Sequence, residues 1–220
     1  MNTLSKTLGF ASAVSCVLAF AGSVNAGTVS DQKGSHSHTP ATTETKTAAD
    51  AKKDDIRDRA LSDWAGVWQS VYPYLMDGTL APVMAKKATK GDKSAAEYRA
   101  YYEAGYKTDV NRIDINGQYI RFFRGKDVAA ATYDADGYEI ITYTSGGWGV
   151  RYIFKKIRGD NAAPGFIAFS DHTTVPKVSD HYHLYSSNDR ATLLKEIDNW
   201  PTYYPARLDA KGVVEEMLAH

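Results

Sequence analysis

The segment "DVNRIDINGQYIRFFR", residues 109–124, decides the fold class of this chain. Two runs rich in β-branched and aromatic residues meet at Asn116-Gly117, the strongest short-range signal for a tight β-hairpin. The sequence downstream repeats this pattern. It predicts a second pair of strands around Asp136-Gly137 within residues 128–144, and further strands at residues 149–157, 165–172 and 181–187.

Seven or so short strands with regular turn signals predict a closed or nearly closed antiparallel β-barrel. Helices are expected on either side of the strand region. The tyrosines of residues 94–106 recur at helical spacing, and residues 186–200 and 209–220 also have helical patterns. The predicted fold class is therefore mainly β with flanking helices.

The N-terminal sixty residues differ from the rest of the chain. Lys6, a following apolar run and a small-residue pattern ending at Ala26 predict a cleaved signal peptide over residues 1–26. The run is too short and too rich in Ala and Ser for a membrane span. Residues 27–60 have no aromatic residue and predict a mobile polar leader containing "SHSH". One domain, residues 61–220, is expected to hold the core.

Charge and cysteine content narrow the function classes. The chain has 26 basic and 26 acidic residues, and Lys6 is the only charged residue before Gly27, so signal cleavage leaves 25 − 26 = −1. This balance gives no support for nucleic-acid binding, which requires a basic face. Cys16 is the only cysteine and lies in the signal segment. The exported chain is thus expected to have neither disulfides nor thiolate metal ligands.

Three of the six histidines, His172, His181 and His183, lie within a dozen residues. On a strand His181 and His183 point the same way, about 7 Å apart. His172 ends the preceding strand, and the intervening "TTVPKVSD" is long enough for the two strands to pair. Three imidazole nitrogens can then converge on one ion, each about 2.0–2.1 Å from a zinc. If the shared face is the barrel interior, this site lies in a cavity mouth.

Further residues are candidate accessory ligands. Three histidines leave the fourth position of a tetrahedral zinc site open, and His36 and His38 of the leader offer imidazoles for it. Glu216 and His220 are four residues apart and therefore lie on one helical face. A solvated polar tail and a frayed helix end are the alternative interpretations of these two pairs. Asp171 and Asp180 each precede a candidate ligand and are expected to face the opposite way. Imidazole also binds Cd²⁺, Ni²⁺ and Cu²⁺, so the sequence does not rank these against Zn²⁺.

Several motifs resemble one known family, in order along residues 61–220: "LSDWAGVWQSVYPYL", "YYEAGYKTD", "YDADGYEIITY", "GVRYIF", "FSDH…HYHLY", "NWPTYYP" and "VVEEMLAH". They closely resemble the ZinT (YodA) family of periplasmic zinc- and cadmium-binding proteins. The resemblance implies a calycin-like, lipocalin-related barrel, and Gly66-Val67-Trp68 fits the G-x-W of lipocalins. The family's three metal-binding histidines match His172, His181 and His183. The resemblance also implies a periplasmic protein that captures scarce zinc and supports its uptake by an ABC transporter, with that transporter's zinc-binding component as partner.

Two other classes of function compete with this interpretation. Three histidines and a water resemble the zinc centre of carbonic anhydrase. The sequence shows no general base near the cluster, however, and no Glu soon after the H-x-H pair, as an iron or manganese cupin requires; we therefore expect no enzyme. A lipocalin-like carrier of a small apolar ligand is the third class, and it leaves the histidine cluster unexplained.

Overall fold

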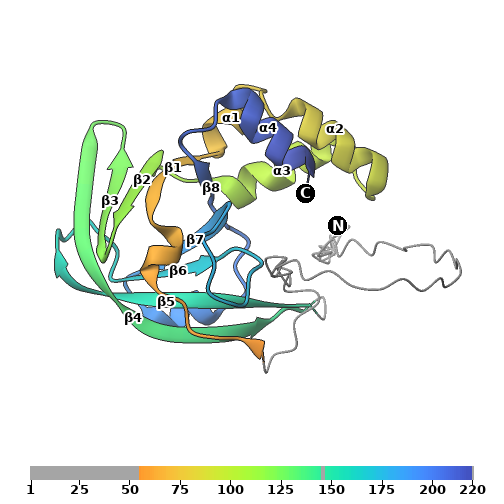
Figure 1. The fold of residues 1–220 in the computed structure, drawn as a ribbon. Coiled ribbons are helices and arrows are strands. Elements are labelled where there is room, and N and C mark those ends of the chain that lie inside the picture. The colour runs from red at the N-terminus through yellow and green to blue at the C-terminus, as the bar shows by residue number, and fades with distance from the viewer. Residues whose placement is uncertain (1–54, 145–146, 220) are drawn as a thin grey trace, which may run out of the picture.

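The computed structural model describes residues 55–144 and 147–219. Its eight strands follow one another around a closed antiparallel barrel, and the last strand pairs with the first (Figure 1). The predicted fold class is confirmed. The strands are β1 (Gly66–Ser70), β2 (Arg112–Asn116), β3 (Tyr119–Arg124), β4 (Asp127–Thr142), β5 (Trp148–Gly159), β6 (Phe166–Ser170), β7 (Tyr182–Ser187) and β8 (Thr202–Pro205).

The α-helices gather on one side of the barrel, next to β8, as Figure 1 shows. None of the helices in the described ranges is both long and apolar enough to cross a membrane. The helices are α1 (Tyr72–Met76), α2 (Ala81–Lys90), α3 (Ala95–Tyr106) and α4 (Ala210–Ala219), with short 3₁₀ helices η2 (Leu61–Trp64) and η3 (Arg190–Leu194).

Local sequence signals explain where some of these elements begin and turn. Helix α3, which confirms the helix expected within residues 94–106, begins at a capping box in which Ser94 and Glu97 bind each other's backbone N–H. Asn116-Gly117 joins β2 to β3 as predicted. Gly117 has a φ of 59°, which a residue without Cβ adopts at little cost.

The predicted pair of strands around Asp136-Gly137 is wrong, because one long strand, β4, runs through both residues. Ala135 pairs with Phe154 and Tyr138 with Tyr152, so two residues of β4 oppose one of β5. This is a β-bulge, and Gly137 supports it with a φ of 78°. The dipeptide that favours a tight turn here bends a continuous strand instead.

The helix expected over residues 186–200 is also wrong, since only η3 forms there. The buried Arg151 side chain donates from Nη1 to the carbonyls of Leu193 and Lys195. A continued helix would use these carbonyl oxygens as acceptors for its own N–H groups. A tertiary contact therefore ends the helical turn early.

The barrel interior is filled by aromatic and aliphatic side chains, and Trp64 of η2 lies at the centre of their packing. Its ring is fully buried and stacks on Phe169 with centroids 4.6 Å apart. Trp64 also contacts Tyr152 and Phe154. The other interior residues include Trp68, Ile113, Ile120, Phe122, Tyr133, Ile167, Tyr182, Leu184 and Tyr203.

Residues 55–60, the end of the predicted leader, pack against this barrel. Ile56 is 3% exposed and belongs to the interior cluster, and Arg59 is 4% exposed. The predicted signal peptide and the rest of the leader lie outside the described residues. In the described part of the chain, ordered packing thus begins a few residues before Leu61.

The helices cover the outer face of β8 and fix the segment that leads into it. Gly105 of α3 lies so close to Trp200 that a Cβ atom would sit 2.3 Å from the indole ring. Asn199 Nδ2 donates to the carbonyls of Ala104, Gly105 and Lys107 at 2.9–3.0 Å, which satisfies the C-terminal end of α3. Strand β8 is therefore held in the barrel by its neighbouring strands and covered on its outer face by the helices.

We predict that Trp64→Ala lowers the free energy of unfolding by about 3–5 kcal/mol, because it removes a fully buried ring and leaves a cavity. Ile157→Ala is the control: Ile157 is 51% exposed, so its loss should cost no more than about 0.5 kcal/mol. Guanidinium unfolding followed by circular dichroism in EDTA measures both. Equal costs would show that Trp64 does not organise the core.

Candidate metal centre

Two of the histidines, His181 just before β7 and His183 on β7, lie on the outer surface of the barrel. Tyr182 and Leu184 belong to the interior cluster, and neighbouring side chains of a strand point to opposite faces. His181 and His183 therefore point outward, toward the helical layer. The expectation that the shared face is the barrel interior is wrong, because Tyr182 and Leu184, which alternate with the histidines, occupy that face.

His172 reaches the same place through an unusual backbone conformation. It follows β6 and has a φ of 62°, the only positive φ among the described residues other than glycine. The left-handed conformation costs a residue with a Cβ atom about 1–2 kcal/mol. Strained backbone of this kind is concentrated at functional sites, where the surrounding structure enforces it.

The structure brings the three predicted histidines together. The centroid of the His172 ring lies 5.6 Å from that of His181 and 5.5 Å from that of His183. The centroids of His181 and His183 are 6.1 Å apart. One ring nitrogen from each lies within 4.8 Å of the others. Tetrahedral zinc with bonds of 2.0–2.1 Å separates its ligand nitrogens by about 3.3 Å, so small side-chain rotations close the group around one ion.

Thr202 of β8 sets the proton position on His183. The Thr202 hydroxyl donates to the Trp200 carbonyl at 3.0 Å, and His183 Nδ1 lies 2.8 Å from the same oxygen. Because the hydroxyl has one proton, its oxygen accepts from His183 Nδ1–H. The Nε2 lone pair of His183 is then available to a metal. Metal-ligating histidines commonly donate their other ring N–H to a neighbouring acceptor in this way, which fixes the tautomer.

Stacking fixes the plane of His181. Its ring lies parallel to Tyr204, with an interplanar angle of 9° and centroids 5.1 Å apart. Tyr204 belongs to the apolar cluster that joins β8 to the helices. The site therefore lies where the helical layer meets the barrel, with one ligand exposed and two half-buried.

The surroundings favour the neutral, metal-binding form of His183. Burial, together with the positive charge that His172 and His181 take up when protonated, holds the pKa of His183 well below its ordinary value of 6.5. The lone pair of this ligand therefore remains available in mildly acidic solution.

The neighbouring carboxylates face away from the cluster. Asp171 is buried and binds Arg59 Nη1 at 2.6 Å, whereas the exposed Asp180 pairs with Lys177 at 3.3 Å. Among the described residues, the metal-binding group consists of three imidazoles and no carboxylate. Glu216 is described and exposed but is not a member of that group. His36, His38 and His220 lie outside the described residues.

Sequence reasoning missed the residues that hold the histidines: Arg59, Thr202 and Tyr204. Thr202 and Tyr204 alternate in "TYYP", and this spacing could have indicated a shared face. The pairing of His183 with Thr202 was needed to place that face beside the site. Arg59 gives no such signal, because it lies in a segment that resembles a polar leader.

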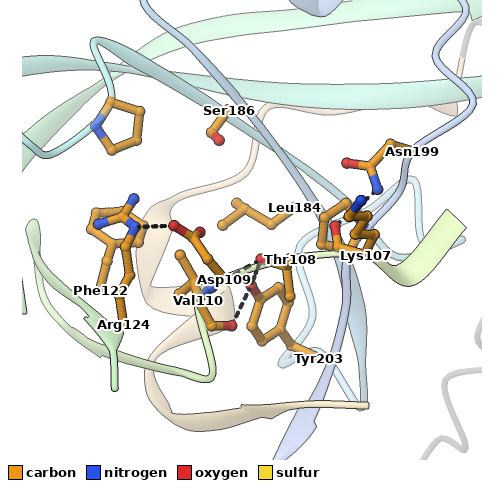
Figure 2. A pocket seen from close by; sticks show the side chains of 12 residues that line it. Lys107, Thr108, Asp109, Val110, Phe122, Arg124, Leu184, Ser186, Asn199 and Tyr203 are labelled. Carbon is orange, nitrogen blue, oxygen red and sulfur yellow. Dashed lines mark hydrogen bonds and ion pairs between the residues drawn. The ribbon is translucent and has the colours of Figure 1, made fainter. Parts of the chain in front are cut away.

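A separate cavity of about 200 Å³ lies on the other side of β7, where Leu184 and Ser186 line it (Figure 2). Its polar groups bind one another: Tyr203 donates to the Val110 carbonyl at 3.0 Å, and Arg124 pairs with Asp109 at 3.2 Å. Small-molecule pockets usually measure about 300–1,000 Å³. This cavity is smaller than that range, and aromatic and aliphatic side chains fill the barrel interior where a lipocalin-like carrier would hold its ligand.

Fold and site together define a class: a lipocalin-like barrel protein with three converging imidazoles on its outer surface. The chain belongs to the ZinT (YodA) periplasmic lipocalin-like zinc-recruitment family, whose model matches residues 42–220.

Named relatives support this assignment. The chain is 49% identical over 170 residues to the probable metal-binding protein YrpE of Bacillus subtilis, a match that covers 77% of this chain and 68% of YrpE. It is 41% identical over 194 residues to the zinc-binding lipoprotein AdcA of Streptococcus pneumoniae, which covers 86% of this chain but only 39% of AdcA. The crystal structure of the Zn(II)-bound ZinT-like domain of that AdcA superposes with a TM-score of 0.75 at 41% identity, covering 80% of this chain and 99% of the domain.

We predict that His183 carries its proton on Nδ1 in the zinc-free protein at pH 7.5, and that Thr202→Val shifts the ring toward the Nε2–H tautomer. The valine removes the only acceptor that the structure gives to Nδ1–H. Long-range ¹H–¹⁵N correlation spectra of the imidazoles distinguish the tautomers, and Thr202→Ser is the matched control that retains the hydroxyl. Identical spectra for wild type and Thr202→Val would contradict the assignment.

Proposed function

We propose that this chain binds Zn²⁺ through one ring nitrogen each of His172, His181 and His183. The observation that supports this most strongly is the convergence of the three nitrogens to within 4.8 Å of one another. Neutral imidazole is a good zinc ligand, and three such ligands leave one tetrahedral position open. The Zn(II)-bound state of the related AdcA domain supports the same metal.

The chemistry of the site suits capture and release of zinc. Three neutral ligands bind the ion without a thiolate, and the open fourth position admits an incoming ligand from another protein. His172 is exposed, whereas His181 and His183 are half-buried. Ligand exchange therefore begins at the exposed side, with His172 replaced first as the ion is transferred.

We further propose a place for this exchange: the periplasm, after export directed by residues 1–26 and cleavage near Ala26. The receiving partner is the zinc-binding component of a zinc-uptake ABC transporter. In AdcA, a ZinT-like domain forms part of a longer zinc-binding lipoprotein. This arrangement supports a role for the present chain beside a second zinc-binding protein.

The proposed role is binding rather than catalysis. Asp171, the buried carboxylate that precedes His172 in the chain, is engaged by Arg59, so this carboxylate is not directed at a metal-bound water as a general base. Assays of CO₂ hydration and ester hydrolysis with the zinc-loaded protein test this. Turnover that disappears in His181→Ala would reject it.

The accessory residues and other metals complete the proposal. His36 and His38 are candidate fourth ligands, and Glu216 with His220 is a candidate weak second site. Because imidazole also binds Cd²⁺, Ni²⁺ and Cu²⁺, competition titrations with these ions establish which of them the site accepts.

We predict that His181→Ala weakens zinc binding at least about 100-fold, since it removes one of the three proposed ligands, whose ring is held in place by stacking on Tyr204. His220→Ala should change the affinity by less than about threefold. Competition with a chromogenic chelator measures both, using protein without a histidine tag. Comparable losses in the two variants would show that the site lies elsewhere.

Zinc affinity should also fall with pH. A proton competes with the metal for each imidazole, and an ordinary imidazole pKa is about 6.5. Its neutral fraction therefore falls about tenfold between pH 7.5 and 5.5. The pKa of His183 is depressed, so this ligand contributes little of the loss in that range, and we expect an overall decrease of about 10–100-fold. Equal affinities at the two pH values would contradict binding by these imidazoles.

A further inference from the structure

The three candidate ligands lie at the two ends of one connecting loop, residues 171–181 between β6 and β7. His172 is near its start, whereas His181 ends it and His183 follows on β7. The distance from His172 to the other two ligands therefore depends on the shape of this loop. Its internal hydrogen bonds are short-range: Thr173 N–H donates to Asp171 Oδ1, and the Ser179 hydroxyl donates to the His181 carbonyl.

Arg59 joins the two halves of this loop. Its guanidinium donates from Nη1 to Asp171 Oδ1 at 2.6 Å, next to His172, and from Nη2 to the Lys177 carbonyl at 2.7 Å, in the second half of the loop. Its third nitrogen, Nε, donates to Asp63 Oδ2 at 2.9 Å. A planar fork with fixed donor directions suits three acceptors of this kind, whereas a lysine ammonium does not.

Asp63 adds further hydrogen bonds to the same loop. Its carboxylate accepts from Lys177 N–H at 3.2 Å and its carbonyl from Ser179 N–H at 2.8 Å. Arg57 N–H donates to the Thr174 carbonyl at 3.1 Å. Residues 57–63 thus bind the loop at four points along its length.

The Arg59–Asp171 ion pair is buried in the barrel core. The Arg59 and Asp171 side chains are 0% and 1% exposed. The guanidinium carbon lies 4.1 Å from the centroid of the Trp64 ring and 5.1 Å from that of Tyr152, within the range of cation–π attraction. Arg59 therefore fixes the 171–181 loop, which lies outside the barrel, to side chains that are packed rigidly in its interior.

We propose that Arg59, with Asp63, is a positioning residue of the metal centre: it holds the 171–181 loop so that His172, in its left-handed conformation, meets His181 and His183 before the ion arrives. It acts through the loop and does not touch the metal. This inference rests on the zinc-binding function proposed above. A preorganised site binds more tightly because the ion does not have to order its ligands.

The test compares zinc affinities of folded variants by chelator competition at pH 7.5. Arg59→Met retains an apolar chain of similar length but makes none of the three hydrogen bonds, and we expect it to bind zinc about 10–100-fold more weakly, the range usual for groups that support metal ligands. Arg59→Lys should fall between Arg59→Met and wild type. Asp63→Ala, at a side chain that is 15% exposed, is the second variant and decides the question if Arg59→Met does not fold.

Arg151 provides a matched control. It is equally buried, lies 4.1 Å over the Tyr185 ring and binds backbone carbonyls, but of η3 and Lys195 rather than of the histidine loop. Arg151→Met should lose stability and keep zinc affinity within about twofold of wild type. Hydrogen exchange adds a direct readout: the Lys177 and Ser179 amides should exchange faster in Arg59→Met but not in Arg151→Met.

The outcomes separate the two proposals. If wild type binds no zinc, the proposed function fails and this inference with it. If wild type binds and His181→Ala does not, the proposed function holds. The positioning role is then overturned if folded Arg59→Met or Asp63→Ala binds like wild type, or if Arg151→Met loses as much affinity as Arg59→Met.

Discussion

The alternation of side chains along β7 is the constraint on which the rest of the structure depends. Tyr182 and Leu184 are drawn into the barrel interior because they are large and apolar. His181 and His183 are consequently forced outward in the same direction. The packing of the core and the geometry of the metal centre thus depend on opposite faces of the same stretch of chain. A shift of β7 by one residue in its pairing register would destroy both.

β7 provides only part of the proposed site, since His183 and the adjoining His181 would leave one side of an ion uncovered. The remaining geometry comes from elements distant in sequence. Thr202 and Tyr204 of β8 orient His183 and His181, while residues 57–63 hold the loop that carries His172. The site is assembled where the barrel, the helical layer and the N-terminal segment meet.

Sequence patterns predict the parts of this molecule that local chemistry determines. Asn116-Gly117 forms the expected hairpin, and the helix expected from the tyrosine spacing forms as α3, because the acceptors and the φ angles they need are within a few residues. Asp136-Gly137 has the same local signal but becomes a bulge, since pairing with β5 continues on both sides of it. The face that His181 and His183 occupy was readable from the alternating apolar residues Tyr182 and Leu184. Arg59 was not readable, because its three partners are set by tertiary structure alone.

Closure of the barrel has a consequence for a chain whose only cysteine is Cys16. Each of the eight strands is hydrogen-bonded to a neighbour on either side, so no complete strand is left as a template for association with another molecule. The proposed zinc ligands, in contrast, lie at the periphery of the barrel, on one loop and one strand. Cohesion of the protein and occupancy by metal are therefore largely independent, unlike the case of a zinc finger, which unfolds when its metal is removed. The pairing of every strand edge in the closed barrel therefore does not depend on an ion at the proposed site.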